Sequence, residues 1–207
     1  MYLPDAFAER DREVLFAHIE EWGFGLLISD GASGLVVSHI PFLLDRRGEE
    51  VFLQGHLARE NPQCAELAAE GEALAVFPGP DAYISPSWYA RGPAVPTWNY
   101  VAVHAYGAIS RKDDEAWLSS FLRRLVARHE AVTPSPWRFE DLPREYLREM
   151  LLGIVGFEIA VSRIEGKWKL SQNRPAADRP RIIAALSERG DPQSLAIARL
   201  MRRREPS

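Results

Sequence analysis

The alternation of apolar and polar residues predicts a chain built mainly from short antiparallel strands. Strand-like runs occupy residues 23–30, 34–45, 49–57, 72–80, 100–111 and 154–174. The first three are joined by the turn-type sequences "DGASG" and "RRG", and "EGK" offers another turn within the last run. Links this short join antiparallel neighbours, because a parallel pair needs a crossover of a dozen residues or more.

Helical periodicity appears between and after these runs. Residues 11–22 place Val14, Leu15, His18, Ile19 and Trp22 on one face. Further helices are expected at 61–71, 113–131 and 143–152, followed by a C-terminal pair divided by "RGDP". Residues 81–96 are rich in proline and are expected to be irregular. The predicted fold class is α+β, mainly β: about six antiparallel strands that close into a barrel, with inserted and C-terminal helices.

Length and composition place the chain among ordinary globular proteins. Its 207 residues suit one substantial domain with an appended element, which we place at 1–173 and 174–207. The hydrophobic fraction of 46% is enough for a core without disulfides. The single cysteine, Cys64, fits a reducing compartment. Because no signal peptide or apolar spanning segment is evident, we expect a cytoplasmic protein without a membrane partner.

The charge is unevenly distributed along the chain. The net charge is −4, yet residues 174–207 carry eight arginines against four acids, and the end reads "LMRRREPS". A negative total argues against nucleic-acid binding over the whole surface. The basic C-terminal helices fit a solvated helix terminus, whose cations suit the helix dipole, or a contact with DNA or an acidic partner.

Several familiar motifs are missing from the sequence. "GFG" at 23–25 lacks the third glycine and the helix of a dinucleotide fingerprint, and neither a Walker sequence nor a nucleophile elbow occurs. His39, His56 and His104 lie on predicted strands without cysteine or carboxylate at ligand spacing, so no metal site is predicted. Cys64 is interpreted as a small packing residue.

Four stretches carry more polar and aromatic chemistry than strands require. They are "SHIPF" (38–42), "GHLAREN" (55–61), the pair "YISPSWY" and "PTWNY" (83–100), and "KWKLSQNR" (167–174). Pro41 cannot donate to a ladder, which indicates a sheet edge or bulge with free neighbouring amides. Arg59, just before a helix start, suits an anion such as phosphate. Trp88, Trp98 and Tyr89 could form an apolar wall.

Each stretch alone is more typical of structure, since tryptophans often close barrel ends and late-hairpin lysines are usually solvated. Together they describe a ligand with a phosphate, a heterocycle edge that alternates donors and acceptors, and an aromatic face. FMN fits that description. The same residues predict that Arg59→Ala weakens FMN binding by roughly 1.5–3 kcal/mol through loss of a charge-assisted hydrogen bond.

The sequence also resembles a known family along most of its length. The segments "MYLPDAF", "GHLARENP", "FPGPDAYISPSWY", "VPTWNYVAVHAYG", "IVGFEIAVSRIEGKWKLSQNR" and "DRPRIIAAL" are similar, in order, to the FMN-binding negative transcriptional regulators of the Pai-B type. The resemblance implies an FMN-binding split barrel that acts as a homodimer with the flavin at the subunit interface. Cys64 departs from the pattern, which has an aromatic residue after "NPQ".

The resemblance also assigns candidate cofactor-binding residues. Ser38, His39, Ile40 and Pro41 would line the isoalloxazine, and His56 and Arg59 would approach the phosphate. The remaining candidates, which would form the pocket wall and the contribution of the last hairpin, are Trp88, Thr97, Trp98, Asn99, Lys169, Gln172 and Asn173.

Three functions are compatible with these residues. The first is an FMN-binding negative transcriptional regulator, with possible DNA contact through the basic C-terminal helices. The second is a flavin-dependent oxidoreductase or oxidase of the pyridoxamine phosphate oxidase-like group, in which the flavin does the chemistry. The third is a haem-handling protein of the same barrel. Catalytic residues cannot be assigned from the sequence.

Overall fold

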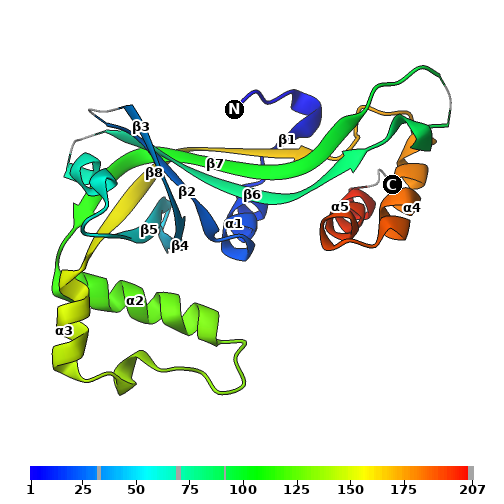
Figure 1. The fold of residues 1–207 in the computed structure, drawn as a ribbon. Helices are drawn as coiled ribbons and strands as arrows, with labels where there is room; N and C mark the ends of the chain where they lie inside the picture. Colours follow the sequence, from blue (N-terminus) through cyan, green and yellow to red (C-terminus); the bar gives the residue numbers. More distant parts are fainter. Residues whose placement is uncertain (32–33, 69–70, 91, 205–207) are drawn as a thin grey trace. The chain divides into compact units, whose positions relative to one another are not determined.

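The computed structural model describes residues 1–31, 34–68, 71–90 and 92–204 (Figure 1). Its strands are β1 (Ala8–Glu9), β2 (Phe24–Gly31), β3 (Gly34–Pro41), β4 (Leu43–Arg47), β5 (Glu50–Ala58), β6 (Glu72–Ile84), β7 (Thr97–Lys112) and β8 (Ile154–Lys169). Its α-helices are α1 (Arg12–Glu21), α2 (Glu115–Glu130), α3 (Arg144–Leu152), α4 (Asp178–Arg189) and α5 (Pro192–Arg203). Short 3-10 helices are η1 (Asp5–Phe7), η2 (Pro62–Ala68), η3 (Pro86–Trp88) and η4 (Phe139–Asp141).

The described strands form one sheet in the order β3-β2-β6-β7-β8-β5-β4, with β1 paired to β8. The pairs β2–β3, β2–β6, β4–β5, β5–β8 and β1–β8 are antiparallel. The predicted α+β, mainly β class is therefore confirmed, with eight strands in place of about six. Within the described residues the ladder ends at β3 and β4, although β3 packs beside β5. Among these residues no ladder joins β3 to β4, so the barrel is split between its two end strands.

The second predicted run, residues 34–45, divides into two strands at Phe42. Pro41 ends β3, and the backbone N–H of Phe42 donates to the Gly23 carbonyl at 2.8 Å. The Phe42 side chain is 1% exposed. Proline cannot donate to a ladder, so the chain leaves β3 there and starts β4 on the other side of a buried anchor. The loop residues 32–33 of the β2–β3 hairpin, expected to form a turn, lie outside the described residues.

The predicted end of the 72–80 strand at Pro80 is wrong, because β6 continues to Ile84. The described β2–β6 pairs join Leu74, Ala75 and Val76 of β6 to β2. Pro78 and Pro80 lie after Val76, beyond this paired part, so β6 does not need an N–H donor there to pair with β2. Prolines are tolerated at such positions, and the strand continues.

The predicted turn at "EGK" is also wrong, because β8 is continuous from Ile154 to Lys169. Two contacts explain the difference. Strand β1 pairs here, with Ala8 opposite Lys167 and Glu9 opposite Gly166. A Cβ placed on Gly166 would lie 2.1 Å from Cδ2 of Leu15, so the glycine permits the close approach of α1. The expected final hairpin is thus one long strand.

The helix expected at 61–71 is a 3-10 helix over Pro62–Ala68, and residues 69–70 lie outside the described residues. The Asn61 side chain accepts from the backbone N–H of Gln63 at 2.9 Å, as expected for a cap. Helix α1 begins after Asp11, whose carboxylate accepts from the Glu13 N–H at 2.9 Å. The tight, short η2 supplies a much weaker dipole than the α-helix expected from the sequence.

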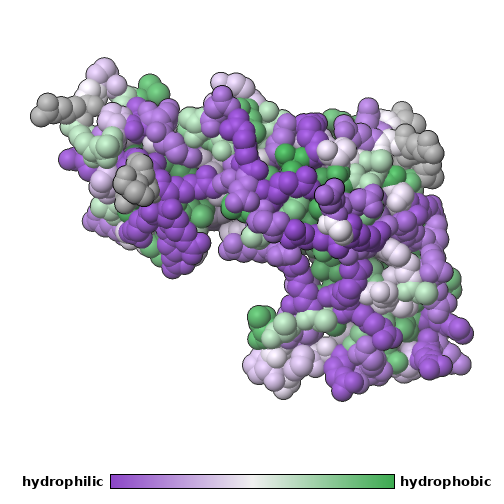
Figure 2. All heavy atoms as spheres, turned by 180° about the vertical axis from the view of Figure 1, so that it is seen from behind, coloured by the Kyte–Doolittle hydropathy of each residue, from purple (hydrophilic) through white to green (hydrophobic). Residues whose placement is uncertain are grey.

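The chain forms two compact units, and each is discontinuous in sequence. The first unit comprises Met1–His18, Phe77–His104 and Glu165–Ser207, and the second comprises Ile19–Val76 and Ala105–Ile164. Strands β6, β7 and β8 contribute residues to both. The helices α4 and α5 belong to the same unit as the N-terminal residues, and the division proposed at residue 173 stays a prediction. The face seen in Figure 2 is mostly hydrophilic, with apolar residues scattered over it.

Helices α4 and α5 form a hairpin within the first unit (Figure 1). Gly190 ends α4 in the left-handed conformation with φ 71°, and Asp191 caps α5 by accepting from Ser194 N–H at 2.9 Å. Buried Arg179 donates to the carbonyls of Leu170 at 2.8 Å and Met201 at 3.1 Å. This guanidinium ties the segment after β8 to both C-terminal helices.

Candidate functional site

The predicted cofactor residues fall into the two units. Six lie in the second unit: Ser38, His39, Ile40, Pro41, His56 and Arg59. Seven lie in the first unit: Trp88, Thr97, Trp98, Asn99, Lys169, Gln172 and Asn173. Each group is described within its own unit.

Strand β3 carries four of the candidates at one end of the described sheet, as expected from Pro41. Successive side chains of a strand point to opposite faces, so the four candidates divide into two pairs. Ser38 is opposite buried Leu27 and shares the inner face with Ile40. His39 and Pro41 lie on the outer face, and His39 is exposed. Only their backbone could present all four residues to one ligand.

Ser38 is held in place by the residue that caps η2. The Asn61 amide donates to Ser38 Oγ at 2.9 Å. Next to it, the fully buried Gln63 donates from Nε2 to Ser29 Oγ at 2.9 Å. The amide side chains of Asn61, in "GHLARENP", and of Gln63, just after it, therefore brace the inner face of β2 and β3.

His56 lies beneath α2 on the second unit. It pairs with Gly156 of β8, and a Cβ on Gly156 would lie 2.3 Å from the Trp117 ring of α2. The His56 ring packs edge-on against Phe121, with centroids 5.7 Å apart. Its Nδ1 is buried and has no partner among the described residues. Burial lowers the pKa of His56, so the imidazole is neutral at pH 7.

Arg59 is anchored to the start of β8. Its backbone N–H donates to the Gly153 carbonyl at 2.8 Å, its Nε to Leu152 O at 2.7 Å and its Nη2 to Ile154 O at 2.8 Å. Asp113 lies 3.5 Å from both terminal nitrogens. These contacts occupy most of the guanidinium donors on a side chain that remains 42% exposed.

Lys169 is the centre of a cationic cluster in the first unit. Its ammonium donates to the Thr97 hydroxyl at the start of β7. Burial lowers the pKa of Lys169, and the neighbouring charges of Lys167 and Arg174 lower it further. Three cations that repel one another create a local positive potential, which favours a bound anion.

The other two cations of this cluster are bordered by aromatic rings. Lys167 Nζ donates to the Tyr2 carbonyl at 2.9 Å and lies 5.3 Å from the centroid of the Tyr100 ring. The Arg174 guanidinium lies 4.3 Å above the ring of Tyr89. Tyr89 is itself 7% exposed, and its hydroxyl has no partner among the described residues.

Asn99 and Gln172 make internal contacts. Asn99 is fully buried, exchanges hydrogen bonds of 3.0 and 3.1 Å with Ser171 Oγ, and lies 3.6 Å from Met201 Sδ. Gln172 accepts from the Leu170 N–H at 2.6 Å and donates to the Trp168 carbonyl. They shape the end of β8, where Ser171 adopts φ 61°. Asn173, by contrast, is exposed.

The two tryptophan candidates differ in their surroundings. Trp98 is 52% exposed and meets Tyr83 of the neighbouring strand β6 edge-on, with centroids 5.9 Å apart. Trp88 ends η3, and its carbonyl accepts from Arg181 Nε at 3.0 Å. The exposed Trp98–Tyr83 pair provides an apolar surface against which a ring could lie.

The first unit has groups that fit FMN. Lys169, Lys167, Arg174 and the Thr97 hydroxyl are suited to a phosphate, and Trp98 offers an aromatic face. A bound flavin would supply one- and two-electron redox chemistry, while the chain positions it and sets its electrostatic surroundings. Lys167 and Arg174 were missed as individual candidates, although both lie within the quoted stretch "KWKLSQNR".

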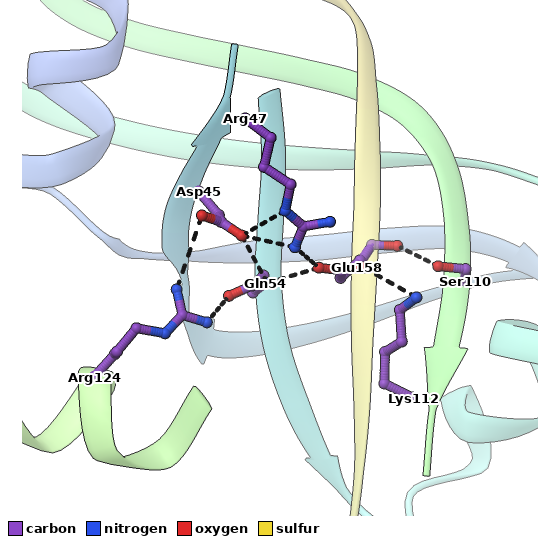
Figure 3. Close-up of polar contacts among 7 residues, drawn as sticks. All are labelled: Asp45, Arg47, Gln54, Ser110, Lys112, Arg124 and Glu158. Atoms are coloured by element: carbon purple, nitrogen blue, oxygen red, sulfur yellow. Dashed lines mark hydrogen bonds and ion pairs between the residues drawn. The ribbon is translucent and has the colours of Figure 1, made fainter. Parts of the chain in front are cut away.

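A second polar cluster was not predicted from the sequence at all. Buried Glu158 of β8 accepts from Arg47, Gln54 and Lys112, with Gln54 at 2.6 Å and Lys112 at 3.0 Å. Burial raises the pKa of Glu158, but these donors outweigh burial and lower the pKa to about 2. The signal was a single acid and a single amide in otherwise apolar strands, "VGFEIAV" and "FLQGHL". Figure 3 shows this cluster, whose labelled members are Asp45, Arg47, Gln54, Ser110, Lys112, Arg124 and Glu158.

Among the described residues, no group of three or more His, Cys, Asp or Glu side chains is placed to hold a metal ion. No helix in the same residues has the length and apolar character needed to cross a bilayer.

The sheet and its polar residues define a flavin-binding split barrel, and comparison with known proteins supports this class. A family model described as "Putative FMN-binding domain" matches residues 1–163. The chain belongs to this FMN-binding family. The prediction of the family and of FMN as its cofactor is therefore confirmed.

Sequence similarity to a known protein covers nearly the whole chain. It is 34% identical over 201 residues to the protease synthase and sporulation protein PAI 2 of Bacillus subtilis, covering 97% of this chain and 96% of the relative. Among solved structures it resembles a FAD and haem binding protein from Mycobacterium smegmatis, with a TM-score of 0.60, 16% identity and coverage of 78% and 73%. A flavocytochrome from Azotobacter vinelandii gives a TM-score of 0.59, 15% identity and coverage of 78% and 69%. These two likenesses support the split-barrel fold.

Proposed function

We propose that this protein is an FMN-binding transcriptional regulator that acts as a homodimer and whose output depends on the state of the flavin. The proposal is supported by family membership and by the similarity to PAI 2, whose name connects it with protease synthesis and sporulation. The observation that carries the FMN part is the cluster of Lys169, Lys167 and Arg174, because three neighbouring cations suit a phosphate.

We assign the phosphate of FMN to Lys169 and Thr97, with Lys167 and Arg174 adding to the positive potential. Trp98 is assigned to the flavin ring. In the second unit, β3 offers a sheet-edge backbone at Ser38–Pro41 for a heterocycle, and Arg59 and His56 remain candidates with the internal contacts described above.

The homodimer is supported by the outer face of the second unit's sheet. Directly opposed residues share a face, so Ile28 lies beside Val37 on β3 and Leu74 on β6. In the next row, Leu26 lies between His39 and Val76. This face is apolar yet unburied: Val37 is 50% exposed, Leu35 75% and Phe24 64%. An apolar sheet face of this kind is stabilised when another copy covers it.

The experiment that tests the cofactor is an absorption spectrum of the purified protein. Regulator and oxidoreductase alike predict a flavin band with about one FMN per chain, whereas a haem protein would give a Soret band. A Soret band without flavin would overturn the assignment.

Regulation and catalysis are then separated by two further measurements. We expect bound FMN to resist rapid bleaching by reduced nicotinamides in air, and we expect promoter affinity to differ between oxidised and reduced flavin. Rapid turnover with a reduced nicotinamide, together with identical DNA affinity in both redox states, would favour the oxidoreductase.

A further inference from the structure

A cavity of about 510 Å³ lies in the second unit beside the C-terminal half of α2 and the segment that follows it. Its volume is within the range of small-molecule sites in proteins. The lining residues that matter here are the apolar Val126, Ala127, Ala131, Pro136, Trp137 and Phe139. None of these residues belongs to the candidate flavin groups.

The segment after α2 that lines the cavity is held by defined contacts. The Trp137 N–H donates to Glu130 Oε2 at 2.8 Å, which fixes the segment to the end of α2. The Arg123 guanidinium lies 5.3 Å above the Phe139 ring and 3.2 Å from the Glu140 carboxylate. The Trp137 side chain remains 46% exposed, so an aromatic wall is open to a ligand.

The charges around the cavity favour an anion. Three arginines and two glutamates line it, and both glutamates are engaged, Glu140 by Arg123 and Glu130 by the Trp137 N–H. Of the remaining cations, Arg138 has a long, exposed ion pair, whereas Arg124 also donates a hydrogen bond to Gln54 Oε1. Arg124 lies 4.0 Å from Asp45, and Arg138 lies 3.9 Å from Asp141, with half or more of the Arg138 pair exposed. Loose, exposed ion pairs are exchanged for another anion at little cost.

We propose that this cavity binds a small organic acid with a compact apolar body and one carboxylate or sulfonate group. The apolar wall contacts the body of the ligand, and Arg124 and Arg138 bind its anionic group. The net lining charge of one positive unit selects a monoanion over a neutral compound of the same shape. This site is independent of the proposed FMN site.

Arg124 connects the cavity to the sheet. Besides lining the cavity, it donates to Gln54 Oε1, and Gln54 Nε2 donates to Glu158 at 2.6 Å (Figure 3). An anion that draws Arg124 toward the cavity removes the donor from Gln54, two residues from His56 on β5. Occupation of the cavity is thereby linked to the strand that carries His56.

The test uses two fluorescent probes that share their rings and differ in charge. The probe 8-anilinonaphthalene-1-sulfonate is an apolar monoanion, and N-phenyl-1-naphthylamine is its neutral counterpart. Calorimetric titration of the FMN-loaded protein should give one saturable site for the sulfonate and at least about 10-fold weaker binding of the amine. Equal affinity for the two probes would overturn the monoanion selectivity.

Substitutions of lining residues test whether the probe binds in this cavity. Arg138→Gln and Arg124→Gln should each weaken the sulfonate about 5- to 10-fold and leave the amine unchanged. Ala127→Trp should fill the cavity and abolish binding of both probes, and Thr133→Trp, at another lining residue, serves if that variant does not fold. Arg148→Gln, an exposed arginine of α3 outside the lining, is the matched control and should change neither.

Near-UV circular dichroism and flavin content are measured for every variant, because loosely packed proteins also bind the sulfonate. Sulfonate binding that survives both cavity-filling variants, in folded protein with full flavin content, would overturn the site. Loss of FMN with retained sulfonate binding would count against the proposed function alone.

Discussion

Individual residues divide into those whose polar groups are committed to the fold and those that remain available. Asn99, Gln172 and Arg59 are largely committed, since their side chains hold Ser171, the end of β8 and the carbonyls of residues 152–154. Lys169 and Trp98 are the more available of the predicted residues. The sequence identified polar residues correctly as unusual, but it did not distinguish these two roles.

Lys169→Ala is expected to weaken FMN binding by about 1.5–3 kcal/mol, because a charge-assisted hydrogen bond to the phosphate is lost. Riboflavin, which lacks the phosphate, should bind the variant as it binds the wild type. Both affinities are measured by fluorescence quenching. Lys169→Arg should restore most of the FMN affinity, and Arg199→Ala, on the exposed side of α5, is the charge-matched control. An equal loss for riboflavin and FMN would remove Lys169 from the phosphate.

Arg59→Ala is expected to weaken FMN binding by roughly 1.5–3 kcal/mol if Arg59 reaches the phosphate. The structure adds a second expectation: unfolding by urea should occur at a lower concentration, because three carbonyl and carboxylate partners lose their donor. Lower stability combined with unchanged FMN affinity would leave Arg59 as an anchor of β8.

Glu158 makes the free energy of unfolding depend on pH in the acid range. Its pKa is lowered to about 2 in the folded chain, so its ionised form stabilises the fold above the ordinary value near 4.5, and this stabilisation is lost as the pH falls from about 4.5 to 2. A lowering of this size corresponds to about 3 kcal/mol. Glu158→Gln should lower the free energy of unfolding at pH 7 and flatten its decline below pH 4.5.

Urea unfolding of both proteins at several pH values measures this effect. Glu149→Gln on α3, an exposed site, is the control and should leave the profile unchanged. If the Glu158→Gln and wild-type profiles run parallel between pH 4.5 and 2, the network does not contribute this pH dependence.

At the scale of elements, the periodicity of apolar residues and the turn and capping residues predicted most strands and helices. Packing against other elements decided how long each one is. The turn expected at "EGK" did not form because β1 pairs with Gly166 and Lys167. The strand expected to end at Pro80 continues to Ile84 beside β7. Local propensity at these sites is weaker than the gain from a paired or packed strand.

The outer face of β2, β3 and β6 gives a prediction about assembly. Wild-type protein should elute with twice the 23.3 kDa mass of one chain in light-scattering chromatography. Val37→Asp places a charge beside Ile28 on this face and should shift the population to monomer. Val132→Asp, at an 89% exposed position elsewhere in the second unit, should leave the mass unchanged. A dimer that tolerates Val37→Asp at low protein concentration would place the interface on another surface.

At the scale of the whole molecule, charge distribution bears on DNA. Arg199 and Arg203 are exposed on α5, whereas Arg204 is paired with Glu9. If α5 contacts phosphates, affinity for duplex DNA should fall steeply with salt, and the paired change Arg199→Gln, Arg203→Gln should reduce the slope by about 2.

Mobility shifts at several salt concentrations measure these slopes. Arg144→Gln with Arg148→Gln, two exposed arginines of α3, is the charge-matched control. Absence of any salt-sensitive shift in the wild type would end the proposal of direct DNA contact by these helices.

The sequence by itself determined the mainly antiparallel architecture, the sheet-edge position of "SHIPF", the C-terminal helical pair and the family, because these depend on local periodicity, on turn and capping residues, and on motifs along the chain. The tertiary structure decided the rest. It placed His56 beneath α2, clamped Arg59 to the start of β8, grouped Lys167 and Arg174 around Lys169, and buried Glu158 among three donors. Which polar groups are satisfied within the fold depends on partners that are distant in sequence, and only folding brings them together.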